Sequence, residues 1–578
     1  MKKISFLSLL SALVLLSMTW LSCSKYETEP KDWFTSALTF DSLDQNGIVA
    51  GYDLNNIYTY LPNGFDRIDG DFLDDGAGEA VPTKLNSLVT QYYKGTLSVT
   101  NNPDAYWASS YYGIRRSTIF LKNIDRVPIV ATTKRYWKAE ARWLRAYFYW
   151  ELLKRYGGVP LLGDTLLGLN DNIQLPRASF AQTVDYIVSE CNAVKDSLRT
   201  ETLSSSDFGR VPRGAAVALK CRVLLYAASP LFNGGGVESD PVKKELTGYP
   251  TYDASRWQKV VDACTEFNAL PYYALVTGGT ATTLASVFIN KMNTDIIFSK
   301  QVPNSTSLEY SQSPVGYVVS NTRSFGLTSP TQNFVNAFPT SKGGTITEDV
   351  RSTSNTTGYD STNPYANRDP RLAATVFYHG LQWLNRAVQL NEGGADKPNN
   401  PSIAPVQTRT GYYLRKFLGA FSTGTSFSSQ SHNFPYFRYT EIVLNWAEAL
   451  NETGQTEQAV TQINRLRSRA GITAGTNNRY GIRAGITQTE MRALIQNERR
   501  IELAFEEHRF WDIRRWKIAP QVLDNATLTG IKITTSGTAT AYQTVPVATT
   551  AWANRMYHMP LPYDEITKNP KLIQNEGW

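Results

Sequence analysis

Cysteine is scarce in this chain, with four in 578 residues. Cys23 ends an N-terminal apolar segment, which leaves Cys191, Cys221 and Cys264 scattered through sequence of helical periodicity. An odd number of scattered cysteines makes no disulfide framework, and no CxxC or Cys/His spacing of a zinc site occurs. We interpret Cys221, within ALKCRVLLYAA, as a small buried hydrophobic residue. The sequence therefore predicts no disulfide framework, no metal site and no cofactor.

Histidine, the commonest general base, is equally scarce. His379, His432, His508 and His558 stand in neither an HExxH motif nor a GxSxG elbow. Glu507 and His508 are adjacent, so on a helix their side chains diverge by about 100° and make a poor ligand pair. We interpret His508 as a buried core histidine.

Dense basic runs are absent as well. The formal charge is +7, and it falls to +5 if Lys2 and Lys3 leave with a cleaved leader, which argues against nucleic acid as a partner. Acidic residues gather once, in DGDFLDDGAGE, where Asp71, Asp74 and Asp75 lie close together. A glycosidase would use two such carboxylates, so a hydrolase stays open as an alternative. The loop lacks the twelve-residue ligand pattern of a calcium site.

Long apolar runs are absent after the N-terminus. Lys2 and Lys3 precede an apolar stretch over residues 4–21, which is typical of a secretory leader. Ser22 before Cys23 is the small residue that lipoprotein processing needs, although Trp20 stands where a Leu is more usual. The sequence predicts a signal peptide at 1–22, lipid attachment at Cys23 and a polar tether at 23–32. A plain signal peptide or an uncleaved anchor remains open, because the run approaches the roughly 20 apolar residues of a membrane span.

Helical periodicity dominates the first half of the chain and returns after a long interval. Between about 270 and 430 the sequence is rich in Gly, Ser, Thr, Asn and Pro with scattered aromatics, which predicts functional loops and short strands. We expect one domain at 33–578, with a helical scaffold at about 33–268 and 436–517 and a loop-rich ligand face at about 270–430. The predicted helices cover 107–126, 134–156, 180–198, 212–228, 254–267, 436–450 and 457–469.

The segment 497–517, NERRIELAFEEHRFWDIRRWK, is predicted to be one helix buried on both sides. Phe505 and Phe510 project from different faces, and the same segment carries Glu498 and Asp512 where a core would lie. Burying such charges costs several kcal/mol per ion, as a rough guide, unless each is paired. The alternative is a solvated helix held by ion pairs three residues apart, which would leave its aromatic rings exposed.

Aromatic residues are abundant, at 12% of the chain, and many stand in polar loops. Flat rings beside Asn, Arg and Asp suit sugars, because the apolar C–H faces of a sugar pack on rings while its hydroxyls bond to amides and charges. Peptide backbones suit the same groups. The composition therefore predicts an open site for oligosaccharide, with peptide as the alternative.

Seven blocks and the C-terminal ending together resemble the SusD/RagB family of nutrient-binding outer-membrane lipoproteins. The resemblance implies a mainly α, SusD-like fold in which tetratricopeptide-like helix pairs form a scaffold and long loops with short strands form the ligand face. It also implies a non-catalytic, lipid-anchored protein on the cell exterior that passes its ligand to a SusC-like TonB-dependent outer-membrane transporter. Glu27 and Glu29 look like the acidic signal for surface export. The blocks include GIRRSTIFLKNI (113–124), AEARWLRAYFYWELLKRYGGVPLL (139–162), GRVPRGAAVALKCRVLLYAASPLFN (209–233), NRDPRL (367–372), TGYYLRKF (410–417) and YFRYTEIVLNWAEALNETG (436–454).

By position in this resemblance, Trp107 is expected to be a ligand-stacking ring. The loops supply the other ligand-binding candidates. These are Asp74, Asp75, Tyr92, Tyr93, Tyr310, Tyr317, Asn321, Arg323 and Trp383.

Overall fold

The computed structural model describes residues 36–104, 106–168, 170–200, 204–319, 321–347, 356–421 and 426–578. The predicted signal peptide, Cys23 and the tether lie outside the described residues. Within them, no helix combines the length and the apolar character that a membrane crossing requires.

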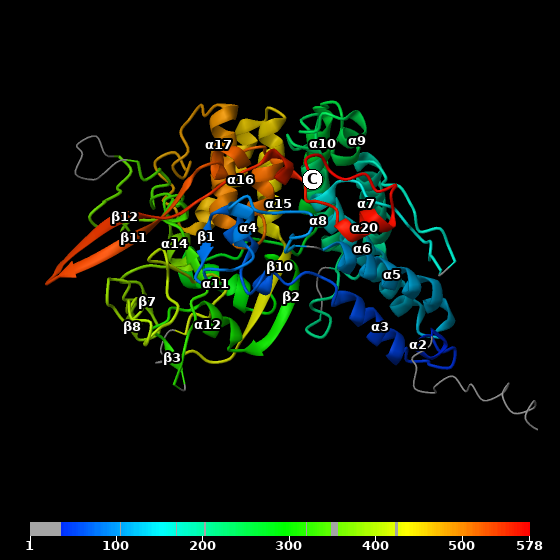
Figure 1. Cartoon of the computed structure of the whole chain (residues 1–578), viewed down its shortest axis with the longest axis horizontal. Coiled ribbons are helices and arrows are strands. Elements are labelled where there is room, and N and C mark those ends of the chain that lie inside the picture. Colours follow the sequence, from blue (N-terminus) through cyan, green and yellow to red (C-terminus); the bar gives the residue numbers. More distant parts are fainter. Residues whose placement is uncertain are drawn as a thin grey trace, which may run out of the picture.

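Long helices pack side by side and form the scaffold (Figure 1). Each packs against the next along the chain from α5 to α8, and α10 joins α8 to the later group of α15, α16 and α17. The prediction of a mainly α fold with paired helices is confirmed, and the predicted helices match within a few residues. Their bounds are α3 Ile48–Tyr58, α5 Trp107–Asn123, α6 Ala131–Tyr156, α7 Phe180–Val194, α8 Arg213–Ala228, α10 Ser255–Asn268, α15 Tyr439–Glu452, α16 Thr456–Ala470 and α17 Gln488–Glu502.

Local signals place several of these helix ends. α7 begins with a capping box in which Ser179 and Gln182 bond to each other's backbone, and Thr487 and Glu490 do the same for α17. α6 ends at Gly157, which adopts a φ of 81° that L side chains rarely adopt. The shorter helices are α2 Ser36–Thr39, α4 Thr90–Tyr93, α9 Pro241–Thr247, α11 Ala281–Ile289, α12 Ser307–Gln312, α13 Gln332–Val335, α14 Pro370–Thr375, α18 Arg509–Arg515, α19 Ala519–Leu523 and α20 Tyr563–Lys568.

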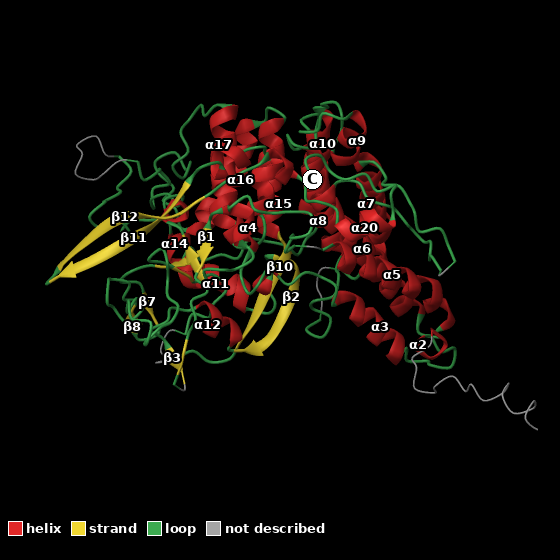
Figure 2. Ribbon diagram, viewed as in Figure 1, coloured by secondary structure: helices red, strands yellow, loops and turns green. Residues whose placement is uncertain are grey.

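Strands occur as antiparallel pairs among the loops on the other side of the molecule (Figure 2). The predicted short strands are confirmed, but two longer pairs were not predicted. One joins β2 to β10, and the other is the projecting hairpin of β11 and β12. The pairs are β1 Ala80–Pro82 with β5 Thr328–Pro330, β2 Ile296–Ser305 with β10 Gln430–Arg438, β3 Val318–Val319 with β4 Thr322–Arg323, β6 Val376–Phe377 with β9 Tyr413–Leu414, β7 Gln382–Trp383 with β8 Arg386–Ala387, and β11 Thr527–Ser536 with β12 Ala539–Thr549.

The single helix predicted over 497–517 is wrong. α17 ends at Glu502, α18 begins at Arg509, and Phe505 between them has a φ of 61°. The break follows from competition for backbone groups. Lys416 Nζ donates to the carbonyls of Glu502, at 3.1 Å, and Ala504, at 2.8 Å, which a continuing helix would use itself.

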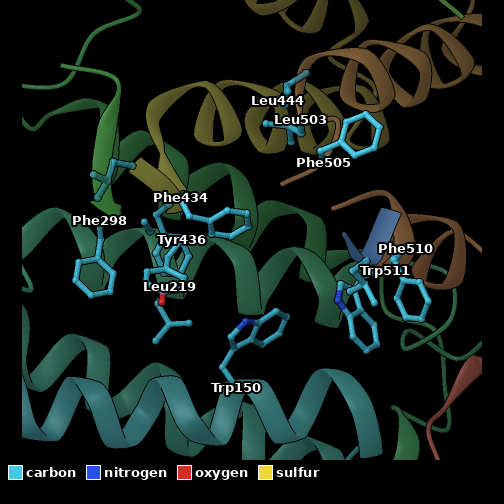
Figure 3. Packing of buried hydrophobic residues seen from close by; sticks show 14 of the residues in the cluster. Trp150, Leu219, Phe298, Phe434, Tyr436, Leu444, Leu503, Phe505, Phe510 and Trp511 are labelled. Atoms are coloured by element: carbon cyan, nitrogen blue, oxygen red, sulfur yellow. The ribbon is translucent and has the colours of Figure 1, made fainter. Parts of the chain in front are cut away.

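Burial of this segment on both sides is confirmed. Phe505 packs on the far side from α6, with its ring centroid 5.7 Å from that of Phe72. Trp511 lies toward α6, where the Lys154 ammonium stands 5.3 Å from its ring centroid. Figure 3 shows Phe505 beside Leu503, whereas Phe510 and Trp511 lie apart from them. The segment therefore joins the helical scaffold to the loop region.

Glu498 and Glu502 of α17 are buried and paired with arginines from other elements, so the alternative of a solvated helix over 497–517 is wrong. Glu498 lies 2.6 Å from Arg371 of α14. Glu502 lies 2.6 Å from Arg469 of α16, 2.9 Å from Arg371 and 3.2 Å from Arg438 at the end of β10. We call these five residues the ion network. It ties the scaffold to the loop region, because two glutamates of α17 pair with arginines that are far from them in the sequence.

Candidate ligand-binding surface

Most of the predicted ligand-contacting side chains are inside the protein. Tyr310 is half-buried, and Asn321 and Arg323 are exposed. The other seven are Asp74 and Asp75 (0% exposed), Tyr92 (0%), Tyr93 (1%), Trp383 (2%), Tyr317 (4%) and Trp107 (5%).

Asp74 and Asp75 lie in the 3-10 helix η2 Leu73–Ala77, which is packed beneath the break between α17 and α18. Asp74 Oδ1 accepts a hydrogen bond from the Phe505 N–H at 2.8 Å, whereas neither Asp75 oxygen has a partner among the described residues. Burial raises the pKa of Asp74 to about 7 and that of Asp75 well above its usual value. The prediction that they contact ligand is therefore wrong in this structure, and the hydrolase alternative loses its two carboxylates.

The buried tyrosines and Trp383 are core residues. Tyr92 meets Phe510 edge to face at 4.9 Å, and Tyr317 meets Trp383 at 4.7 Å. Tyr317 also donates its hydroxyl proton to the Trp383 carbonyl. These rings and Tyr93 are buried, so a ligand on the protein surface cannot contact them.

Trp107 forms the wall of a pocket of about 330 Å³ rather than an open platform. Its ring packs against Tyr111 at 5.0 Å and Tyr156 at 5.3 Å. Tyr112, 61% exposed, is the ring of this pocket that solvent reaches. Leucines and Ile173 add apolar wall, and Arg115, Glu565, Lys568 and Asn569 supply polar and charged groups to the lining.

The three accessible candidates come together around the β3–β4 hairpin. Asn321 stands at its turn with a φ of 63°, a conformation that Asn tolerates better than most residues. Arg323 pairs in register with Val318. Tyr310 supports the hairpin, because its hydroxyl donates to the Val319 carbonyl at 3.1 Å.

Phe325, which the sequence analysis missed, adds an aromatic ring beside this hairpin. It is 49% exposed, and its N–H donates to the Tyr310 carbonyl at 2.8 Å. This hydrogen bond fixes the backbone of Phe325, and about half of the side chain is exposed to water. A ligand could therefore stack on the ring with little loss of conformational entropy in the protein.

A second segment lies alongside. The Thr83 N–H donates to the Leu327 carbonyl at 2.7 Å, so the chain after β1 runs past the residues that follow Phe325. Leu85 and Leu88 are 67% and 45% exposed there, and Lys84 pairs with Asp69 at 2.9 Å. Leucines in a polar loop are visible in the sequence and could have marked this segment. Its contact with residues about 240 positions later could not be predicted from the sequence. We call the whole set the hairpin surface, comprising Asp69, Lys84, Leu85, Leu88, Val318, Asn321, Arg323 and Phe325.

The hairpin surface combines apolar contact area with groups of both charges. Phe325 and the two leucines offer faces for sugar C–H groups. Asp69, Asn321 and Arg323 offer a carboxylate, an amide and a guanidinium for hydroxyls. Such a mixture of rings, amide and charges suits a saccharide or a peptide backbone on an open surface.

Two family models match most of the chain. The SusD family matches residues 294–578, and a family described as starch-binding and associating with the outer membrane matches residues 43–225. SusD-like protein P2 of Formosa agariphila is 35% identical over 31% of this chain, and the match spans only 30% of that protein. SusD-like protein P25 of the same organism is 22% identical over 98% of this chain and 97% of its own length.

Solved structures agree. A SusD-like protein of Bacteroides fragilis is 28% identical, with a TM-score of 0.75 over 93% of this chain and 98% of that one. A SusD-like carbohydrate binding protein of the same species is 21% identical, with a TM-score of 0.69 over 92% of this chain and 99% of that one. These likenesses define a class of glycan-binding proteins associated with the outer membrane. The chain belongs to the SusD/RagB family, and the predicted resemblance is confirmed.

Proposed function

We propose that this protein is a non-catalytic, cell-surface glycan-binding lipoprotein that captures oligosaccharide on the hairpin surface. The observation that carries the proposal is the half-exposed Phe325 ring, set among exposed leucines, an amide, a guanidinium and a Lys–Asp pair. The starch-binding description of the matching family supports a saccharide as the ligand. Peptide capture on the same surface is the second candidate, because amides and rings also suit a peptide backbone.

Isothermal titration of the mature protein against a panel of oligosaccharides and unrelated peptides tests the ligand class. We expect saturable heat with at least one oligosaccharide and modest affinity, because an open surface leaves much of the ligand solvated. Each binding glycan is then incubated with the protein and analysed for shorter products. Binding of peptides alone would overturn the glycan proposal, and product formation would overturn the non-catalytic one.

We propose further that Cys23 carries the lipid anchor and that residues 33–578 form one domain, with the loops facing the ligand and the helices facing the membrane partner. The predicted leader and the outer-membrane association of the family support this arrangement. Replacing Cys23 by Ser should move the protein from the membrane fraction to the soluble fraction and remove label incorporated from radioactive palmitate. Unchanged membrane retention of Cys23→Ser would contradict the anchor.

The partner that we propose is a SusC-like TonB-dependent transporter, which would take up the captured glycan. The outer-membrane association of the matching family supports this partner, because a glycan captured at the cell surface has to cross that membrane to be used. Affinity purification of the tagged protein from outer membranes should recover such a transporter in near-equal amount. Recovery of the protein alone under conditions that preserve membrane complexes would contradict this partner.

A further inference from the structure

A cavity of about 350 Å³ is lined by residues of α3, of the loop before α8 and of strand β2. Figure 1 shows α3 and β2 at a distance from β3 of the hairpin surface. This volume is near the small end of the range of about 300–1,000 Å³ for ligand pockets. It suits one or two sugar residues better than the middle of a long chain. The side chains that line it and enter the argument are Asn55, Phe208, Arg210, Ser299, Lys300 and Gln301.

Lys300 supplies an uncommitted positive charge to this cavity. The residue is half-buried on β2, and its ammonium has no ion pair or hydrogen bond with any described residue, whereas Arg210 beside it bonds Glu140 at 3.0 Å and Asn55 at 2.9 Å. Burial lowers the pKa of the Lys300 ammonium, opposed by the charge of Asp66. Asp66 attracts this ammonium but makes no direct ion pair with it, so a half-buried cation is left that an anionic ligand would stabilise.

Two polar atoms beside Lys300 also lack partners. Ser299 Oγ and Gln301 Nε2 are buried and have no hydrogen-bond partner among the described residues. Such atoms are unfavourable unless something completes them, and because both are closed off from solvent, a ligand would reach them only after the side chains turn toward the cavity that their residues line. Gly209 lies directly over the Gln301 side chain. It has a φ of 104°, and a Cβ there would lie 3.5 Å from Gln301 Cδ.

One wall of the cavity is aromatic. Phe208 is half-buried in the loop, and the rings of Tyr58 and Phe298 stand 6.3 Å apart on neighbouring elements. A ring wall combined with several separated polar groups fits the two faces of a sugar, while Lys300 adds a partner for a carboxylate.

We infer that this cavity is a second binding site, specific for a single acidic sugar residue, a uronate at the end of an oligosaccharide. Lys300 pairs with the sugar carboxylate, the Ser299 and Gln301 side chains turn toward the cavity to bond its hydroxyls, and Phe208 packs on its C–H face. The site goes beyond the proposed function, because it selects for charge where the open hairpin surface does not. The protein would then hold an acidic glycan at two places.

The test is isothermal titration of the mature protein with glucuronic and galacturonic acid trisaccharides, a neutral glucose trisaccharide and a triglutamate peptide. We expect at least one uronate trisaccharide to bind at least tenfold more tightly than the other two probes. Replacing Lys300 by Met should weaken that binding at least tenfold, whereas Lys300→Arg should retain most of it. The matched control, Lys94→Met at an exposed position, should leave it unchanged.

Thermal unfolding of each variant distinguishes a loss of binding from a loss of folding. Phe208→Ala is a second variant, which should also weaken uronate binding, although it removes no charge. Equal affinity for uronate and neutral trisaccharides, or full binding by folded Lys300→Met, would overturn the inference. Preference for the triglutamate peptide would also overturn it. None of these outcomes decides whether neutral glycans bind the hairpin surface, because the titrations against the oligosaccharide panel test that proposal separately.

Discussion

Replacing Glu502 by Gln is expected to lower the free energy of unfolding by about 3–5 kcal/mol, the usual cost of breaking a buried ion pair from one side. Glu502 is 6% exposed and serves Arg371, Arg438 and Arg469 at once. Gln preserves the shape but removes the charge, so three buried guanidiniums lose a shared counter-ion. Equilibrium denaturation of the mature protein in urea measures the change.

The pH dependence of this effect follows from the pKa of Glu502. Burial alone would raise that pKa, but the charges of Arg469, Arg438 and Arg371 outweigh it and hold the pKa well below its usual value. The stability that Glu502 contributes is therefore present above its unfolded pKa, near 4.5, and is lost as the pH falls below it. Glu245→Gln, on the exposed face of α9, is the control, with an expected change within about 0.5 kcal/mol. Equal effects of the two substitutions would contradict a structural role for the ion network.

Replacing Asp75 by Asn is expected to act in the opposite direction and stabilise the protein at pH 8 by about 2–4 kcal/mol, the scale of an unpaired buried charge. Asp75 is fully buried without a hydrogen-bond partner among the described residues. Burial, reinforced by the charges of Asp71 and Asp74, raises its pKa well above the usual value. The folded protein therefore prefers the protonated acid, which Asn imitates.

The sign of the pH dependence follows from the same shift. A raised pKa gives stability that is fully present below the unfolded value, near 3.8, and is lost as the pH rises through the folded value. The stabilising effect of Asp75→Asn should accordingly be large at pH 8 and small at pH 4 in thermal melts. Asp185→Asn, at an exposed position on α7, should show neither effect. Destabilisation by Asp75→Asn at pH 8 would contradict this account.

The scaffold could be predicted because its signals are local. Periodicity marked the long helices, and Gly157 marked the end of α6. The break after α17 could not be predicted from local signals. It depends on Lys416, whose ammonium donates hydrogen bonds to backbone carbonyls almost ninety residues later in the chain. Sequence periodicity continued through the break because Phe505 and Phe510 are both buried, in different environments.

The family blocks were informative about packing rather than recognition. Arg371 from NRDPRL and Arg438 from YFRYTE belong to the ion network, and Lys416 from TGYYLRKF lies 2.6 Å from Glu506 beside it. Their charges specify how the loop region docks on the scaffold. A resemblance built on such residues, in their order along the chain, identifies the fold and carries no information about the ligand.

The ligand face was harder to predict because aromatic content does not reveal burial. Tyr317 and Trp383 stand in polar sequence, yet they pack on each other in the interior. Asn321 and Arg323 are exposed as expected. Phe325 lies two residues beyond Arg323, and only its exposure in the structure identifies it as a candidate for ligand contact.

The most direct test of glycan capture at the hairpin surface compares Phe325→Ala with the unaltered protein in titrations against an oligosaccharide that binds. The account predicts a loss of about 1–1.5 kcal/mol, or roughly five- to tenfold in affinity, for removal of the stacking ring. Tyr252→Ala, at a ring 65% exposed elsewhere, should bind normally. Full affinity in Phe325→Ala, with loss in Tyr112→Ala at the Trp107 pocket, would contradict the account and move the binding site to that pocket.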